Sequence, residues 1–297
     1  EEILDVRPVG VTDGFFDLGG HSLAAVRLMA AVRRQFGRDL PLSTLFRGAT
    51  VESLAAILRT SGPAPAASPL VPLTPLRAGS DRPPLFCVHG AGGGVLVFTD
   101  LARGLGEDQP LYALEARGLD RVEAMAGAYL EAIRTVQSEG PYHLLGYSMG
   151  GKIAFEMARR LERDGQEVAL LTLIDIPAVP SPAALEAEDR LAVPPEIAGL
   201  PDFDASTAER YLAVYRANRE ASRAYVPGPY EGRLLLLTAE DGNGRDAADP
   251  TLGWEAFAAG GVEVHRLPGG HYTLLGAAYA GAVVDLLRER LAQTVPA

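Results

Sequence analysis

The sequence has very few of the residue types that carry special chemistry or cross-links. Its 297 residues include one cysteine, Cys87, one tryptophan, Trp254, and one lysine, Lys152, so arginine supplies nearly all the positive charge. A single cysteine excludes an internal disulfide and is typical of a protein in the reducing cytoplasm. Because Cys87 lies within the apolar run PLFCVHG, we expect a packed thiol rather than a nucleophile.

Long hydrophobic runs and clustered basic charge are also missing. No stretch of about 18 apolar residues occurs, so no membrane span is expected, and the first residues, EEILDV, do not form a signal segment. The net charge of −11, with acidic residues spread along the chain, argues against nucleic-acid binding. No spacing of Cys and His indicates a metal site, and no Walker-type phosphate loop is present. The composition is otherwise ordinary, with 47% hydrophobic residues to form a core.

A proline-rich segment divides the chain. Residues 61–72, SGPAPAASPLVP, hold four prolines and small side chains that cannot bury a core, so we expect a semi-extended linker. Before it, apolar residues recur at helical spacing over 23–36, and Thr50 is a good N-cap for a helix over 50–58. We therefore predict a small all-α domain over residues 1–60 and a larger domain over residues 73–297.

Short apolar runs alternate with helical stretches in the larger domain. The predicted strands are 85–89, 111–116, 142–147, 170–175, 233–239 and 262–267. The predicted helices are 97–106, 122–138, 149–164, 252–259 and 276–292. This alternation predicts a mostly parallel sheet covered by helices on both faces. Residues 176–232 interrupt it, and we expect them to form an insertion over one end of the sheet with a helix over 206–225.

A strand-to-helix turn carries the clearest chemical motif. Residues 146–150, Gly-Tyr-Ser-Met-Gly, follow an apolar strand and precede a helix, which is the context that a nucleophile elbow requires. The turn exposes the Ser148 hydroxyl at the positive end of the helix. A serine needs a base to act as a nucleophile. His271, in LPGGHYTLL after the last strand, lies where the chain order serine, acid, histidine puts that base.

Two aspartates compete for the position of the acid. Asp175 ends the strand 170–175, and Asp241 follows the next strand in LTAEDG. Both are expected at the carboxyl edge of the sheet, where such sites form. We favour Asp175, although an aspartate before Pro177 also fits a structural turn, and Asp241 stays open as the alternative.

A glycine-rich loop, residues 89–94, follows the first predicted strand of the larger domain. Such a loop can direct a backbone N–H group at a developing oxyanion, together with the N–H group of the residue after the nucleophile. This nominates Ala91 and Met149 as the two donors. A phosphate-binding loop is the rival interpretation, but the segment lacks the lysine and the G-x-G-x-x-G spacing of such loops.

These features together resemble the thioesterase domains that end nonribosomal peptide synthetases. VHGAGG, GYSMGG, Asp175, the insertion and GGH carry the resemblance, which covers about residues 73–297. It implies an α/β-hydrolase fold in which residues 176–232 form a helical lid. It also implies a triad of Ser148, Asp175 and His271. Members of that family often have proline where this chain has Gly90.

A second motif lies in the small domain. Residues 13–23, DGFFDLGGHSL, resemble nearly letter for letter the core of peptidyl carrier domains, which are of the four-helix-bundle type. The resemblance implies that Ser22 bears 4′-phosphopantetheine at the start of a helix, a favourable place for a phosphate. Without it, Ser22 fits an ordinary N-cap equally well. Carrier domains have a full helix ahead of this motif, and only EEILDV remains of it here, so the first carrier helix is expected to be truncated.

The two resemblances imply a chain-terminating enzyme. A peptidyl thioester on Ser22 would pass to Ser148 and then leave by hydrolysis or macrocyclisation. The implied partners are upstream condensation and adenylation domains, a phosphopantetheinyl transferase and the peptidyl thioester itself. An acyl carrier with a polyketide thioesterase is the alternative, although His21 and Tyr147 favour peptide chemistry. An inert binding protein would need the serine, aspartate and histidine in order by accident, and the fused carrier argues against a free-standing esterase.

Overall fold

A computed structural model describes residues 1–20, 22–38, 40, 43–59, 68–74, 82–182, 185–186, 205–241 and 249–294. Most of the predicted linker and part of the predicted lid lie outside the described residues. The predicted boundaries 1–60, 61–72 and 73–297 stay a prediction. Within the described residues, no helix has both the length and the apolar character needed to cross a membrane.

The N-terminal part is helical. It contains α1 (Ser22–Phe36), α2 (Thr44–Arg47) and α3 (Val51–Arg59). Thr50 caps α3 as the sequence predicts, since its Oγ1 accepts a hydrogen bond from the Ser53 N–H group at 3.1 Å. Apolar side chains of these helices and of the preceding loop form a separate small core: Phe15, Ala24, Ala25, Met29, Val32, Leu40, Leu45 and Leu54.

The larger part is built on a seven-stranded sheet. Its strands are β1 (Leu70–Thr74), β2 (Leu85–Val88), β3 (Leu111–Leu114), β4 (Tyr142–Tyr147), β5 (Val168–Ile174), β6 (Leu234–Ala239) and β7 (Val262–Leu267). They lie in the order β1-β3-β2-β4-β5-β6-β7, and all neighbours are parallel except β1 and β3. The residues of β2, β3 and β4 are all buried, as expected for a parallel sheet with two covered faces.

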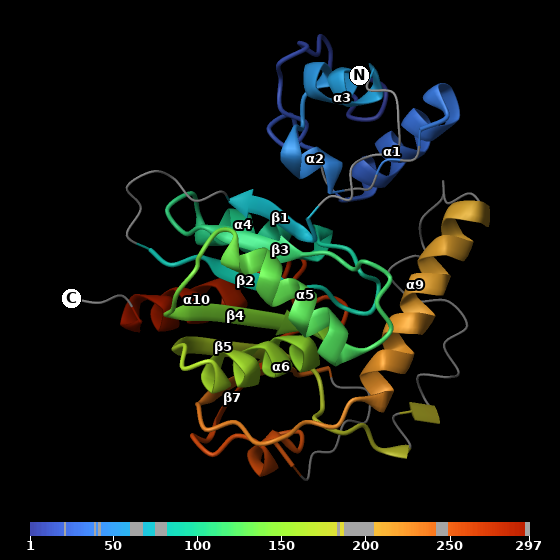
Figure 1. The fold of residues 1–297 in the computed structure, drawn as a ribbon. Helices are drawn as coiled ribbons and strands as arrows, with labels where there is room; N and C mark the ends of the chain where they lie inside the picture. Colours follow the sequence, from blue (N-terminus) through green and yellow to red (C-terminus); the bar gives the residue numbers. More distant parts are fainter. Residues whose placement is uncertain are drawn as a thin grey trace.

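Helices cover both faces of this sheet (Figure 1). On one face lie α5 (Val122–Arg134) and α6 (Met149–Arg163), and on the other lie α4 (Thr99–Leu105), which follows the short η1 (Leu96–Phe98), and α10 (Ala280–Gln293). Each face has its own apolar core. The structure thus confirms the predicted fold class of a helical carrier region and an α/β-hydrolase domain with a mostly parallel sheet.

Two elements differ from the sequence predictions. Strand β1 was not expected because Pro72 lies within it; β1 is the edge strand of the sheet, where a residue without an N–H group is tolerated. The helix predicted over 252–259 is only the short turn η2 (Trp254–Ala256). Gly253, with φ 81°, breaks the helical backbone there. Trp254 is fully buried and donates its indole N–H to the Ile176 carbonyl oxygen.

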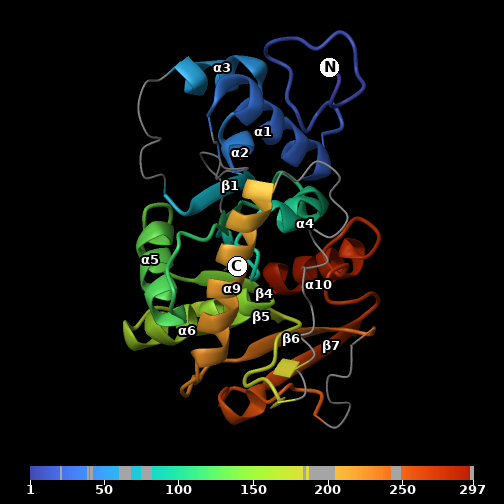
Figure 2. The same cartoon turned by 90° about the vertical axis from the view of Figure 1, so that its right-hand side faces the viewer.

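The predicted insertion contains the helix α9 (Ala205–Ala224), which we call the lid helix. It lies across the carboxyl ends of the parallel strands, as two perpendicular views show (Figures 1 and 2). Two buried side chains fasten its C-terminal end to the domain. Lys152 Nζ donates to the Ser222 carbonyl oxygen at 2.7 Å, and Tyr225 Oη donates to Glu156 Oε2 at 3.1 Å. A cation near the last carbonyl groups of a helix is favourable for its dipole.

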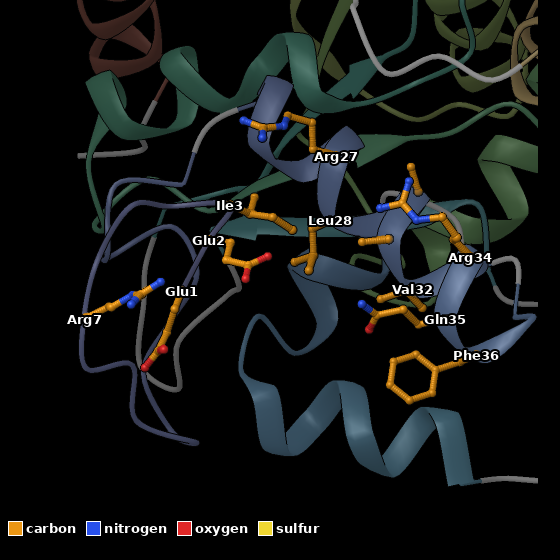
Figure 3. Close-up of a pocket in the computed structure, with 12 residues that line it drawn as sticks. Glu1, Glu2, Ile3, Arg7, Arg27, Leu28, Val32, Arg34, Gln35 and Phe36 are labelled. Atoms are coloured by element: carbon orange, nitrogen blue, oxygen red, sulfur yellow. The ribbon is translucent and has the colours of Figure 1, made fainter.

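The small helical part packs against the sheet domain through α2, and near its own N-terminus it holds a pocket. Ser43 is buried in the contact, and its Oγ donates to Glu115 Oε2 at 2.8 Å. Phe46 packs on the core beneath α4 and α10. The pocket, of about 600 Å³, lies between the first residues and α1 and combines charged and apolar side chains, Arg7 and Phe36 among them (Figure 3).

Candidate active site

Ser148 lies at the sharp turn between β4 and α6. Its backbone has φ 54° and ψ −132°, a conformation that costs a non-glycine residue free energy and is typical of a nucleophile elbow. Position 150 needs a glycine because the backbone after β2 passes very close to it. A Cβ atom there would lie 2.3 Å from the His89 carbonyl oxygen. Small neighbours therefore allow the turn to close and leave the hydroxyl at the carboxyl edge of the sheet.

The structure brings Ser148, His271 and Asp175 into one hydrogen-bonded series. His271 Nε2 lies 3.1 Å from Ser148 Oγ, and His271 Nδ1 lies 2.7 Å from Asp175 Oδ2. The Asp175 side chain is 4% exposed and that of His271 is 15% exposed. Asp175 is further held because its Oδ1 accepts the Ala239 N–H group at 3.2 Å. A buried carboxylate in this position fixes the ring with its proton on Nδ1, which leaves Nε2 to accept the serine proton.

Asp241, the other candidate for the acid, is placed differently. It is exposed, and its backbone N–H group donates to the Gly269 carbonyl oxygen in the loop before His271. The carboxylate that is described in contact with His271 belongs to Asp175. The geometry therefore favours Asp175.

The glycine-rich loop lies beside Ser148. A Cβ atom built on Gly90 would lie 3.6 Å from Ser148 Cβ and 3.0 Å from a ring carbon of Tyr147. Met149 is the first residue of α6, so its N–H group has no acceptor within the helix. In the described part of the chain, neither its N–H group nor that of Ala91 donates to a backbone carbonyl. Met149 directly follows Ser148, and Ala91 directly follows Gly90, so both predicted donors lie in segments next to the serine, and no backbone acceptor is described for either N–H group.

His89 is a residue of this site to which the sequence analysis assigned no role. Its Nδ1 donates to the Gly90 carbonyl oxygen at 2.7 Å, because that oxygen can only accept, and its Nε2 then accepts the Tyr129 hydroxyl at 2.6 Å. Burial lowers the pKa of His89 to about 4, so the ring is neutral at pH 7. Its place as the first residue of the predicted oxyanion loop, directly before the glycines, is the signal by which the sequence could have revealed it.

Ser22 lies apart from this series, in the small helical part. It is the first residue of α1, a helix of 15 residues that follows a loop containing Gly19 with φ 87°. A phosphate ester at that position would lie at the positive end of a long helix, so the local backbone fits a phosphopantetheine arm. His21, its neighbour in the motif, lies outside the described residues.

Both parts of the chain match known families. Residues 83–291 match the thioesterase domain family, and residues 1–58 match the phosphopantetheine attachment site family. Among curated proteins, malpinin synthetase of Mortierella alpina is 36% identical over 99% of this chain and 4% of its own length. The dimodular nonribosomal peptide synthase of Bacillus subtilis is 45% identical over 59% of this chain and 8% of its own length. The chain thus spans less than a tenth of either of these relatives.

Solved structures give the same result. A four-domain nonribosomal peptide synthetase, holo-AB3403, superposes with a TM-score of 0.68 at 29% identity, over 100% of this chain and 25% of that protein. The NocB thioesterase domain from the nocardicin cluster superposes with a TM-score of 0.61 at 28% identity, over 76% of this chain and 100% of that domain. With its carrier region and its hydrolase domain, the chain belongs to the carrier–thioesterase didomains of nonribosomal peptide synthetases.

Proposed function

We propose that this chain releases a finished peptide from its carrier domain by acyl transfer through Ser148. The observation that carries the proposal is the series Ser148–His271–Asp175, with 3.1 Å and 2.7 Å between its successive polar atoms. Such a series activates a hydroxyl group for attack on an acyl carbon. The Bacillus subtilis relative and holo-AB3403 are nonribosomal peptide synthetases, which favours a peptidyl rather than a polyketide substrate.

The first half-reaction acylates the enzyme. His271 Nε2 takes the proton of Ser148 Oγ as the oxygen attacks the thioester carbonyl, and Asp175 stabilises the imidazolium that forms. The N–H groups of Ala91 and Met149 bind the oxyanion of the tetrahedral intermediate. His271 then gives its proton to the departing sulfur, and the peptide remains as an ester on Ser148.

The second half-reaction releases the peptide. His271 takes a proton from the attacking group, and the same two N–H groups bind the second oxyanion. As the intermediate collapses, the bond from the acyl carbon to Ser148 Oγ breaks, and His271 returns the proton to that oxygen. Attack by water gives a linear acid, and attack by an amine or hydroxyl group of the peptide gives a macrocycle. The lid helix lies over the edge of the sheet where this competition takes place, so the lid segment would determine how well water is excluded.

The carrier region has a separate role in the proposal. Ser22 is the residue to which phosphopantetheine would be attached, at the start of α1. When attached, that group supplies a thiol that holds the peptide as a thioester. Upstream condensation and adenylation domains would deliver the peptide, and a phosphopantetheinyl transferase would modify Ser22.

A loaded-carrier experiment tests this function. Ser22 is loaded with candidate peptidyl phosphopantetheine, and both the protein and the released product are weighed by mass spectrometry. The unmodified sequence should release the peptide, and a product lighter than the linear acid by one water would indicate cyclisation. Ser148→Ala should keep the peptide on the carrier, whereas Ser138→Ala, at an exposed loop serine, should release it normally. Release at the normal rate by Ser148→Ala would contradict the proposal.

A further inference from the structure

The lid helix lies directly on the glycine-rich loop. A Cβ atom at Gly92 would lie 2.3 Å from Tyr211 Oη, and one at Gly93 would lie 2.9 Å from Val214 Cγ1. Real Cβ atoms do not come this close to other atoms, so a larger residue at either position would force the loop or the facing α9 side chains to shift. The position of the lid helix and the shape of the loop therefore depend on each other.

One buried polar residue of the lid helix contacts this loop. Tyr215, Asn218 and Ala221 recur every three residues on α9 and are at most 8% exposed, so they form the face that packs on the domain. Asn218 is 2% exposed, and its Nδ2 donates to the Ala91 carbonyl oxygen at 2.8 Å. A buried amide is costly unless it is hydrogen-bonded, so this contact gives a reason for asparagine on an otherwise apolar face.

Ala91 consequently has hydrogen bonds on both of its peptide units. The Gly90 carbonyl and the Ala91 N–H group belong to one planar unit, which His89 holds through the carbonyl oxygen at 2.7 Å. The Ala91 carbonyl belongs to the next unit, which Asn218 holds. When both planes are held, the two backbone torsions of Ala91 are fixed, and so is the direction of its N–H group.

The two holds come from different parts of the domain. His89 is fully buried and is supported by Tyr129 of α5, so its hold belongs to the core. Asn218 belongs to the lid helix, which is fastened to α6 one turn further along, where Lys152 donates to the Ser222 carbonyl oxygen. The hydrogen bond from His89 is therefore present in every position of the lid helix. The hydrogen bond from Asn218 forms only when the lid helix lies on the loop.

We infer that Asn218 is a positioning residue through which the seated lid helix orients the Ala91 N–H group toward the oxyanion. The inference rests on the proposed function, because it assumes that Ala91 is an oxyanion donor. Acyl transfer then reaches its full rate only when the lid helix lies on the loop. An acyl chain that holds the lid away would slow its own transfer.

The test uses the whole chain and a peptidyl fluorophosphonate that modifies Ser148. Saturation kinetics separate the binding constant KI from the rate constant of the chemical step, in which the phosphoryl oxygen occupies the oxyanion position. Two variants remove the donor, Asn218→Leu and Asn218→Asp, and both side chains have nearly the size of asparagine. Tyr142→Phe is the matched control, because it removes the hydrogen bond of a buried tyrosine to the Gln137 carbonyl oxygen, at the opposite end of β4 from Ser148 and outside both the lid helix and the loop.

Both Asn218 variants should lower the rate constant about 10-fold and change KI less than twofold. This is less than the loss of a complete oxyanion donor, which costs roughly 100-fold or more. Tyr142→Phe should keep the rate constant of the unmodified chain. Unchanged rates in the Asn218 variants, or an equal loss in Tyr142→Phe, would overturn the inference. If the unmodified chain takes up no label on Ser148, the proposed function itself fails.

Discussion

Tyr147 supports His271, the proposed general base, from the position directly before Ser148. The two rings stack with centroids 5.4 Å apart and an angle of 25° between their planes. The Tyr147 hydroxyl also donates to the backbone carbonyl oxygen of His271 at 2.7 Å. One residue of β4 therefore holds both the ring and the backbone of a histidine that is 124 residues away in the sequence.

Removing this hydroxyl should impair catalysis through the placement of His271. Tyr147→Phe keeps the stacked ring but loses one hydrogen bond, which contributes about 1 kcal/mol, so kcat/KM should fall about fivefold. Tyr142→Phe is a matched control at the other end of β4, since its hydroxyl also donates to a backbone carbonyl, that of Gln137. Thioester hydrolysis assays on both variants check the prediction, and equal losses in the two would refute it.

The two candidate acids can be compared directly. Asp175→Asn should lower kcat by roughly 1,000-fold or more, because the histidine loses the partner that holds its proton on Nδ1. Asp241→Asn should leave kcat nearly unchanged, because Asp241 is exposed and its described contact is a backbone one. Steady-state hydrolysis of a peptidyl thioester gives both values. A larger loss in the Asp241 variant would exchange the two assignments.

Stability should decrease as the pH is lowered below neutrality. Burial lowers the pKa of His89 and of His143 to about 4, whereas an unfolded histidine titrates near 6.5. Between these values the unfolded state binds more protons, so the stabilisation is complete above pH 6.5 and is lost as the pH falls toward 4. Each histidine should lower the free energy of unfolding by about 1.4 kcal/mol between pH 7.5 and 5.5.

Urea unfolding at the two pH values measures this loss. His143→Gln keeps a polar side chain near Thr294, whose hydroxyl pairs with His143 Nε2, but it cannot titrate. The pH-dependent loss in this variant should be about half that of the unmodified chain. A free energy of unfolding that stays constant over this range would show that the two histidines do not control it.

Replacing Ser148 by glycine should give a more stable protein than replacing it by alanine, because of the backbone conformation at this position. Its φ of 54° with ψ of −132° belongs to a region that glycine enters without strain. Ser148→Gly should therefore unfold with a free energy about 1 kcal/mol higher than Ser148→Ala, and both should be inactive. At Ser138, which is not among the described residues with positive φ, the order should reverse, because glycine there only adds freedom to the unfolded chain. Thermal unfolding of the four variants provides the measurement.

Most of the parallel sheet and the three residues of the proposed triad could be predicted from sequence because their signals are local. An apolar run followed by Gly-Tyr-Ser-Met-Gly defines β4, Ser148 and the start of α6 without reference to the rest of the chain. Asp175 and His271 follow from the order of strands. The choice between Asp175 and Asp241 needed the structure, because both end neighbouring strands and only distances to His271 separate them.

Features that depend on contacts between distant segments could not be predicted. Strand β1 contains Pro72, which has no N–H group to donate. The proline is tolerated because β1 is the edge strand and pairs with β3 alone. The contact of Asn218 with Ala91 spans 127 residues, and that of Tyr147 with His271 spans 124. No periodicity or motif marks such pairs, so a single sequence does not reveal them.

The burial of Lys152 provides a chemical measure of how often the lid helix moves away from α6. It is the only lysine of the sequence, is 1% exposed, and lies where the C-terminal end of the lid helix meets α6. An amine-reactive reagent therefore finds no accessible lysine while the lid helix is in place. Acylation of this single side chain, located by mass spectrometry of its peptide, would therefore accumulate at the rate at which the helix moves away from α6.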